Sequence, residues 1–337
     1  MKAWQVPAGC TSLEQLELVE RRDPSPGARQ VLVRVRAASL NYRDQFVVTG
    51  AYFGGSATTP TVPLSDGAGE VVAVGAGVER VRVGDRVCAT FFLGWNDGPP
   101  PGPRPARGVP AEGMLAEYAL LDEQDTVLIP PGLSFEEAAT LPCAGVTVWN
   151  ALMHGPRVLK AGETVLSLGT GGVAIFALQI AKLAGARAII TSSSDAKLER
   201  ARALGADHVI NYKTTPEWEK KVLELTEGQG AEHVIDTGGV GTLPKSYIAV
   251  GPAGVVSVIG VMTRPEGDLS PYPLMTKGAM VRGIFVGGRE HFDALMKAVA
   301  VNELKPVIDK TFGFDEAPEA FKYLKSAQHF GKVVIKI

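Results

Sequence analysis

The stretch VLSLGTGGVAIFALQIAKLAG, residues 165–185, joins an apolar run, a burst of glycines and an apolar helical segment. Gly169, Gly171 and Ala174 fit the pattern G-x-G-x-x-G/A between an expected strand and an expected helix. The first glycine permits a tight turn, the second lets the backbone approach a pyrophosphate, and the small third residue lets helix and strand pack closely. The N-terminus of the helix would direct unpaired N–H groups at that phosphate. The stretch therefore predicts a dinucleotide-binding turn, although such glycines also occur at strand–helix junctions that bind nothing.

Strands and helices alternate on both sides of this turn. Ser134 and Glu137 form a capping pattern for a helix at 134–142, ahead of the first strand. Each strand is a nearly continuous apolar run, which predicts a parallel sheet covered on both faces by helices. The expected strands are 164–169, 186–192, 208–212, 233–239 and 254–260, and the expected helices are 172–185, 194–205, 216–228 and 243–251.

The N-terminal part of the chain, residues 1–125, has a different pattern. Residues 30–40 alternate apolar and charged side chains with the period of a half-buried strand, and residues 69–89 give short β-rich runs separated by glycine. Residues 94–113 are so rich in proline and glycine that they predict an irregular lobe. Near the C-terminus, helices are expected at 291–304 and 315–326, and a closing strand at 331–337.

The end of the second strand of the alternating region decides which dinucleotide is expected. A carboxylate there would accept hydrogen bonds from an unphosphorylated ribose. The neutral Ser193 stands near that position, with Ser192, Ser194 and Lys197 close by in the sequence. These groups can donate to a 2′-phosphate, so the sequence favours NADPH. Asp195 could instead bind the ribose of NAD if the register is shifted by two, or could begin the next helix.

Composition excludes several classes of function. The 337 residues carry a net charge of −2 without a basic run, which argues against nucleic acid or an anionic membrane as the main partner. No apolar stretch approaches the roughly 18 residues that span a bilayer, and the N-terminus has no signal-peptide core. The three cysteines are widely spaced and odd in number, which favours a reducing compartment. We therefore expect a cytoplasmic protein.

Several further motifs occur in a fixed order before and after the glycine turn. They are SLNYRD (39–44), PLSDGAGEVVAVG (63–75), GDRV (84–87), LPCAGVTVWNAL (141–152), KLERARALGADHVINY (197–212) and GKVVIKI (331–337). With them the chain resembles, over almost its whole length, the medium-chain dehydrogenase/reductase superfamily of zinc alcohol dehydrogenases and quinone oxidoreductases.

The resemblance implies an α/β fold in which a Rossmann doubly wound parallel sheet is inserted into a GroES-like β-rich catalytic domain. The catalytic domain would comprise residues 1–125 and 290–337, and the dinucleotide-binding domain residues 126–289. It also implies a homodimer joined through the last Rossmann strand, at 280–287.

The chain departs from the pattern of the zinc enzymes at their metal ligands, which are a Cys, a His and a second Cys. Aligning the motifs places Asn41 at the first position, Ser65 at the second and Cys143 at the third. An amide, a hydroxyl and one thiol do not make a tight zinc site. Residues 89–120, where the resemblance would place four cysteines for a structural zinc, contain none. We therefore expect no metal.

The resemblance to zinc-free quinone reductases places Asn41 and Tyr42 near the nicotinamide, with Asp66 as a candidate acid. Structural roles remain open for all three: a turn former, half-buried packing and a hydrogen-bond anchor. Arg43 and Asp44 are expected to hold each other or the loop, and Cys143 to be a small buried residue rather than a nucleophile. The cofactor contacts expected from the glycine turn, the second strand and the resemblance are Asn41, Thr147, Gly169, Thr170, Gly171, Gly172, Val173, Ser192, Ser193, Ser194, Lys197, Tyr212, Gly260, Val261, Phe285, Val286 and Lys332.

The sequence thus predicts a zinc-independent, NADPH-dependent oxidoreductase that transfers hydride to a quinone, a carbonyl or an α,β-unsaturated ketone. Without a metal, hydrogen bonds would have to polarise the electrophilic small-molecule substrate. Two alternatives stay open: an alcohol dehydrogenase working in the oxidative direction, and a non-catalytic NADPH-binding protein. Substrate choice is expected to depend on residues 45–60 and on the lobe at 94–113.

Overall fold

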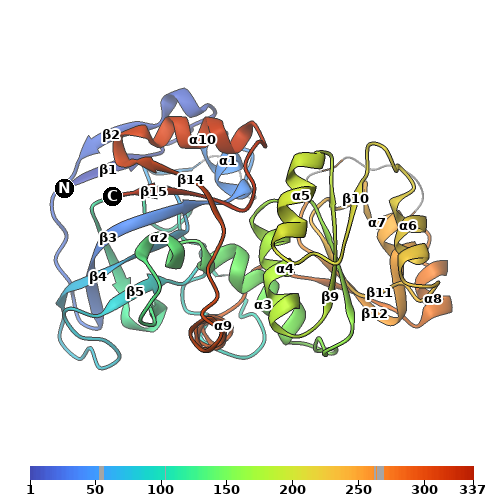
Figure 1. Ribbon diagram of the computed structural model, residues 1–337. Coiled ribbons are helices and arrows are strands. Elements are labelled where there is room, and N and C mark those ends of the chain that lie inside the picture. Colours follow the sequence, from blue (N-terminus) through green and yellow to red (C-terminus); the bar gives the residue numbers. More distant parts are fainter. Residues whose placement is uncertain (53–56, 103, 262, 264–268) are drawn as a thin grey trace. The chain divides into compact units, whose positions relative to one another are not determined.

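A computed structural model describes residues 1–52, 57–102, 104–261, 263 and 269–337 (Figure 1). Residues 53–56 of the expected substrate loop and residue 103 of the proline-rich lobe lie outside this description. The chain divides into two compact units: unit 1 comprises Met1–Val146 and Gly287–Ile337, and unit 2 comprises Thr147–Val286. The chain therefore leaves unit 1, forms unit 2 and returns, as the predicted insertion requires.

Unit 2 is built on a six-stranded parallel sheet in the order β10-β9-β8-β11-β12-β13. The strands are β8 (Thr164–Leu168), β9 (Arg187–Ser192), β10 (His208–Asn211), β11 (Ala231–Asp236), β12 (Val250–Val258) and β13 (Met280–Gly283). Because the order reverses between β8 and β11, a ligand of such a sheet binds beyond the carboxyl ends of these strands. This is the predicted Rossmann topology.

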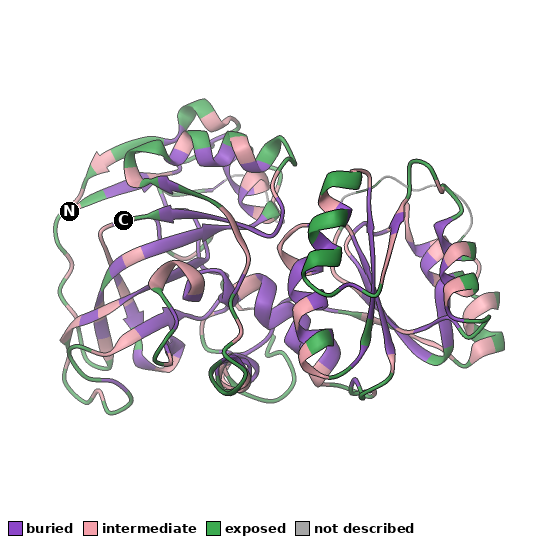
Figure 2. Ribbon diagram, viewed as in Figure 1, coloured by how far each residue is buried: buried purple, intermediate pink, exposed green. Residues whose placement is uncertain are grey.

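Helices cover both faces of this sheet, with α4 and α5 on one face and α6, α7 and α8 on the other (Figure 1). The bounds of these helices are α4 (Gly172–Leu183), α5 (Asp195–Ala203), α6 (Trp218–Leu225), α7 (Leu243–Ala249) and α8 (Tyr272–Lys277). The inner strands β8 and β9 between them are almost wholly buried (Figure 2), which explains their continuous apolar runs. A further helix, α3 (Val146–Met153), leads from unit 1 into unit 2.

Unit 1 contains a seven-stranded mixed sheet and a separate β1–β2 pair. The last strand of the chain runs antiparallel to β3, so that Val333 lies opposite Leu40. The C-terminal tail thereby completes the N-terminal sheet, as the GroES-like prediction requires. The strands are β1 (Lys2–Gln5), β2 (Glu17–Glu20), β3 (Gln30–Leu40), β4 (Asp66–Val74), β5 (Arg86–Ala89), β6 (Tyr118–Asp122), β7 (Thr126–Leu128), β14 (Ile308–Gly313) and β15 (Lys332–Lys336).

Helices and short helical turns complete unit 1. The helices are α1 (Tyr42–Val48), α2 (Phe135–Ala138), α9 (Arg289–Val301) and α10 (Ala317–Lys325), and the turns are η1 (Leu13–Gln15), η2 (Glu123–Asp125), η3 (Leu141–Gly145) and η4 (Phe314–Glu316). Helix α2 begins after Ser134, whose hydroxyl accepts a hydrogen bond from the Glu137 N–H at 3.0 Å. The Glu137 carboxylate accepts the reciprocal bond from the Ser134 N–H at 2.8 Å, so the predicted capping box is present.

The boundaries of the two units differ from the expected ones at 126 and 289. Residues 126–146 belong to unit 1, because α2 packs against β3 and β4 of that unit. The change from β-rich to alternating pattern at 126 therefore marks the appearance of helices, not the start of unit 2.

Among the described residues, no helix is both long and apolar enough to cross a bilayer.

Candidate functional site

The glycine turn after β8 has the geometry that a bound phosphate needs. Gly169 adopts a φ of +89°, a backbone conformation that is strained for residues with a side chain. Gly171 is the N-cap of the twelve-residue helix α4, and in the described chain no side chain caps its first turn. The N–H groups at this end therefore remain directed out of the helix, where an anion would accept their hydrogen bonds.

The loops beyond β8, β9 and β10 are held together at the carboxyl edge of the sheet. The Gly169 N–H donates to the Thr191 hydroxyl at 3.3 Å, and the Tyr212 N–H donates to the carbonyl of Ser192 at 3.0 Å. These bonds bring together three segments of the predicted cofactor site, each about 20 residues from the next along the sequence.

Beyond β11 and β12 the structure adds Asp236 and Thr237, which the sequence analysis did not identify, beside the predicted Gly260. The buried Asp236 accepts hydrogen bonds from the N–H groups of Gly238 and Gly239 at 3.0 and 2.9 Å. A Cβ atom on Gly260 would lie 1.7 Å from the Thr237 carbonyl oxygen, so only glycine fits where these loops meet. The sequence signal that could have identified these residues is an aspartate followed by Thr-Gly-Gly at the end of an apolar run.

The end of β9 presents hydroxyl groups and the start of α5. Ser192 is buried and ends the strand, Ser193 is half-buried, and Ser194 is the N-cap of α5. Asp195 is the first residue of α5, and its carboxylate accepts a hydrogen bond from the Asn211 amide at 2.7 Å. Of the two roles that the sequence left open for Asp195, the structure therefore favours the start of the helix.

The remaining predicted cofactor residues of unit 2 differ in exposure. Thr147 and Val286 are buried, whereas Tyr212, Val261 and Phe285 are exposed. Tyr212 also lines a surface pocket, together with Trp218, Thr242 and Lys245. Thr170, Gly172 and Val173 lie in the glycine turn or its helix, and Lys197 is half-buried in α5.

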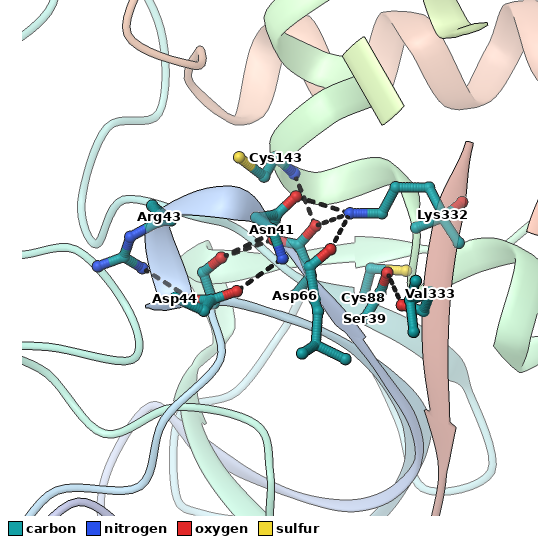
Figure 3. Close-up of polar contacts among 12 residues, drawn as sticks. Ser39, Asn41, Arg43, Asp44, Asp66, Cys88, Cys143, Lys332 and Val333 are labelled. Carbon is teal, nitrogen blue, oxygen red and sulfur yellow. Dashed lines mark hydrogen bonds and ion pairs between the residues drawn. The ribbon is translucent and has the colours of Figure 1, made fainter. Parts of the chain in front are cut away.

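In unit 1, residues from four separate segments form a polar cluster, which we define as Asn41, Ser65, Asp66, Cys143 and Lys332. The Lys332 ammonium donates to Asn41 Oδ1 at 2.6 Å and lies 3.9 Å from Asp66 Oδ2. Asp66 Oδ1 accepts from the Ser65 hydroxyl at 2.7 Å, and Asp66 Oδ2 accepts from the Cys143 N–H at 3.2 Å. Figure 3 shows the side chains of Asn41 and Asp66 beside the end of the Lys332 side chain.

Burial dominates the electrostatics of this cluster. Asp66 is fully buried, and loss of hydration raises the pKa of its carboxyl group, while Lys332 opposes that rise. The neighbouring Asp44 is also fully buried, and burial raises its pKa to about 6 despite Arg43 nearby. Burial likewise raises the pKa of the Cys143 thiol, to which Asp66 adds a smaller repulsion. Cys143 is half-buried, not buried as predicted, and its raised pKa favours the neutral thiol over the thiolate.

Comparisons with known proteins agree with these two units. Residues 27–131 match the family model of the alcohol dehydrogenase GroES-like domain, and residues 172–301 match that of the zinc-binding dehydrogenases. A zinc-type alcohol dehydrogenase-like protein of Schizosaccharomyces pombe is 43% identical, covering 96% of this chain and 94% of its own length.

Two further relatives carry the names of two of the expected activities. A quinone oxidoreductase of Pseudomonas aeruginosa is 32% identical over 96% of this chain and 95% of its own length. The crystal structure of an NAD-dependent alcohol dehydrogenase superposes with a TM-score of 0.90 at 33% identity, with all of both chains covered. The chain belongs to the medium-chain dehydrogenase/reductase superfamily. It is thus an oxidoreductase of a family whose members bind NAD(P).

The zinc that the family model and the S. pombe relative's name imply is not matched by the residues of this member of the superfamily. Two of the three aligned side chains meet, because the Asn41 amide donates to the Ser65 hydroxyl at 3.5 Å. At the third position it is the main-chain N–H of Cys143 that binds the neighbouring Asp66. An amide, a hydroxyl and a protonated thiol are nevertheless poor ligands for Zn²⁺, which binds thiolate and imidazole. Among the described residues, no group of three or more His, Cys, Asp or Glu side chains could hold a metal ion.

The predicted catalytic residues of this dehydrogenase/reductase occupy three different environments. Asn41 is 8% exposed and precedes α1, so it is both a helix N-cap and a member of the polar cluster. Tyr42 is exposed and packs edge-on against Phe46. Asp66 is fully buried with its oxygens engaged, which favours the anchoring role over the catalytic one.

Two predicted basic residues make hydrogen bonds and ion-pair contacts within unit 1. Arg43 donates to the Arg107 carbonyl at 2.7 Å and lies 3.8 Å from Asp44, so it holds both the loop and its neighbour, as predicted. Lys332, expected among the cofactor contacts, is 3% exposed and directs its ammonium into the polar cluster.

Proposed function

We propose that this protein is an NADPH-dependent, zinc-independent oxidoreductase that reduces a quinone, a carbonyl or an α,β-unsaturated ketone. The observation that carries the proposal is the environment at the end of β9, where Asp195 is bonded to Asn211 and neutral serines take the place of a ribose-binding carboxylate. The quinone oxidoreductase of P. aeruginosa, similar over nearly the whole chain, supports the reductive direction.

Unit 2 supplies the residues that would hold the cofactor. The pyrophosphate would accept hydrogen bonds from the N–H groups of the turn at 169–173, where a side chain at Gly169 would be strained. Ser193, Ser194 and Lys197 would bind the 2′-phosphate, since hydroxyl and ammonium groups donate to it. Bound NADPH supplies the hydride for the reduction.

Unit 1 supplies the groups that we expect to act on the electrophile. The exposed Tyr42 carries a phenol that can donate a hydrogen bond to a carbonyl oxygen as negative charge develops on it. The Asn41 amide, fixed by Lys332, can orient the substrate or the nicotinamide carboxamide through its N–H groups. Thr147, at the start of α3, is proposed as a further contact to the nicotinamide side.

The proposal extends to the state of the protein in the cell. We propose a homodimer formed through β13, and a cytoplasmic location, which Cys10 and Cys88 support because both are buried free thiols.

A cofactor and substrate screen tests the function directly. Purified protein would be titrated with NADPH and NADH by calorimetry, and turnover would be followed at the nicotinamide absorbance with quinones, aldehydes and enones. We expect tighter binding of NADPH and turnover of at least one electrophile class. NADPH binding without turnover on any acceptor would favour the non-catalytic alternative, whereas oxidation of alcohols with NAD⁺ alone would favour an alcohol dehydrogenase.

A further inference from the structure

The ammonium group of Lys332 is buried within unit 1 and contacts three oxygen acceptors there. It donates to the Leu40 carbonyl at 2.7 Å and to Asn41 Oδ1 at 2.6 Å, and it lies 3.9 Å from the Asp66 carboxylate. Removing an ammonium from water is costly unless its donors find strong acceptors. These three acceptors are therefore the reason why Lys332 can be 3% exposed.

The pairing of β15 with β3 places Lys332 at this point. Val333 lies opposite Leu40, the last residue of β3, so Lys332 stands beside the residue that follows, Asn41. Lys336, four residues later on the same strand, is largely exposed and lies 3.6 Å from the Glu136 carboxylate. The strand thus carries one buried and one surface lysine.

The hydrogen bond from Lys332 determines how the Asn41 amide is oriented. Because an ammonium only donates, it must face the amide oxygen, and the amide nitrogen then points toward Ser65. The hydrogen bond from Asn41 to Ser65 is 3.5 Å long and therefore weak, so the Asn41 amide N–H can readily donate to a ligand instead. A charged donor on the oxygen also polarises the amide and makes its N–H groups stronger donors.

We propose that Lys332 is a positioning residue that locks and polarises the Asn41 amide, providing the buried positive charge of a reaction site without zinc ligands. Without Lys332 the amide is free to rotate and to present its oxygen, an acceptor, where the nitrogen stands. This inference rests on the proposed function, because it assumes that the Asn41 amide serves hydride transfer. It differs from direct cofactor binding by Lys332, which would require the ammonium to leave its three acceptors.

The first test compares Lys332→Met with Lys336→Met, the same substitution at the exposed lysine of the same strand. For Lys332→Met we expect kcat to fall by about 10- to 100-fold while the NADPH dissociation constant stays within about twofold. Lys336→Met should leave both quantities unchanged. A rise in the NADPH dissociation constant with little change in kcat would overturn the inference and indicate a cofactor contact instead.

A double-mutant cycle tests whether Lys332 acts through Asn41. We expect Asn41→Ala to lower kcat, and Lys332→Met to have little further effect in the Asn41→Ala background. Losses that multiply would show that the two residues act independently and would overturn the inference.

If Lys332→Met does not fold because Asp66 is left without a counter-charge, Lys332→Gln and Lys332→Arg take its place. The arginine variant, which keeps the charge, should retain more activity than the glutamine variant.

Nuclear magnetic resonance of the full chain supplies a readout that does not depend on turnover. In protein labelled with ¹⁵N-asparagine, the Asn41 side-chain signals, assigned by their loss in Asn41→Ala, should shift in Lys332→Arg, whereas those of the exposed Asn302 should not. Unshifted Asn41 signals would overturn the inference. In the wild type, slowly exchanging ammonium hydrogens of Lys332 should show contacts to the Asn41 amide, and their absence would also overturn it. Wild-type protein without turnover would instead count against the proposed function alone.

Discussion

The Asn211 side chain donates a hydrogen bond to the Asp195 carboxylate at 2.7 Å. This bond ties the first residue of α5 to the end of β10 and engages the carboxylate closest to the serines after β9. Because Asp195 also lies in the first turn of α5, its negative charge is favourable toward the positive end of the helix. The carboxylate is thus explained by local structure, and the position expected to bind ribose is held by Ser193.

Ser193→Asp should weaken NADPH binding selectively. A carboxylate at this position would repel the 2′-phosphate, so we expect the NADPH dissociation constant to rise by about tenfold or more. NADH lacks that phosphate, and its dissociation constant should change by less than about twofold or improve. Calorimetry with both cofactors measures the effect.

The matched control for this substitution is Ser326→Asp, at the end of α10 in unit 1. It introduces the same charge far along the sequence from the glycine turn and should leave both dissociation constants unchanged. Equal weakening of NADPH and NADH by Ser193→Asp would point to local damage of the site and would count against the assigned role.

Chelation should not remove activity. Since Asn41, Ser65 and a neutral Cys143 are poor zinc ligands, purified protein should contain far less than one zinc per chain by elemental analysis. Dialysis against a chelator should leave kcat within about twofold of the untreated value. Stoichiometric zinc that leaves together with activity would contradict both the expectation and the proposed mechanism.

The buried Asp44 should make stability fall as pH rises. Burial raises its pKa from 3.8 in water to about 6, so between these values the folded state binds a proton that the unfolded state has lost. Ionisation of Asp44 therefore costs stability as pH passes from about 4 to about 6, and the cost persists above that. Asp44→Asn removes the titration and keeps an acceptor for the Asn41 N–H, which lies 2.7 Å from the carboxylate.

Urea unfolding at pH 4.5 and pH 7.5 measures this effect. Relative to wild type, the free energy of unfolding of Asp44→Asn should increase by roughly 2 kcal/mol between the two values. The control is Asp315→Asn, which makes the same substitution at an exposed carboxylate in η4 and should not reproduce the increase seen for Asp44→Asn. A pH-independent difference for Asp44→Asn would mean that burial does not hold this carboxyl protonated.

Much of unit 2 could be predicted because its elements have local signals. The apolar runs of β8 and β9, which end at Leu168 and Ser192, are buried on both faces, and the glycine turn has a spacing that few other structures require. β14 was missed because Ile308–Gly313 is only half-buried and its apolar residues do not alternate cleanly. The boundary near 146 was also missed, since a helix can pack on either unit and its sequence does not say which.

The polar cluster shows why side-chain roles are harder to predict than elements. Asn41 and Asp66 were identified from motifs, but the position of Lys332 depends on which strand the C-terminal segment pairs with and in which register. A lysine in an apolar strand suggests a solvent-facing position, which holds for Lys336 but not for Lys332. Only the tertiary pairing reveals that its ammonium meets buried acceptors.

The exposed edge of β13 should join two copies of the chain. In the part of the chain that the structure describes, β13 has a strand neighbour on one side, β12, and Val281 and Phe285 on or near it are exposed. An open strand edge with apolar side chains pairs readily with a second copy related by a twofold axis. Light scattering after gel filtration should therefore give about twice the chain mass of 35.6 kDa.

Val281→Lys tests this interface, because a charge on the edge strand opposes pairing of two identical copies. We expect the mass to fall toward that of one chain, with the circular dichroism spectrum unchanged. Val301→Lys, at an exposed valine that ends α9 in unit 1, should leave the mass unaltered. The glycine turn follows β8, which lies between β9 and β11 and away from the β13 edge. Monomeric Val281→Lys should therefore still bind NADPH. A wild-type protein with the mass of a single chain, or a dimer that Val281→Lys does not weaken, would rule out β13 as the contact.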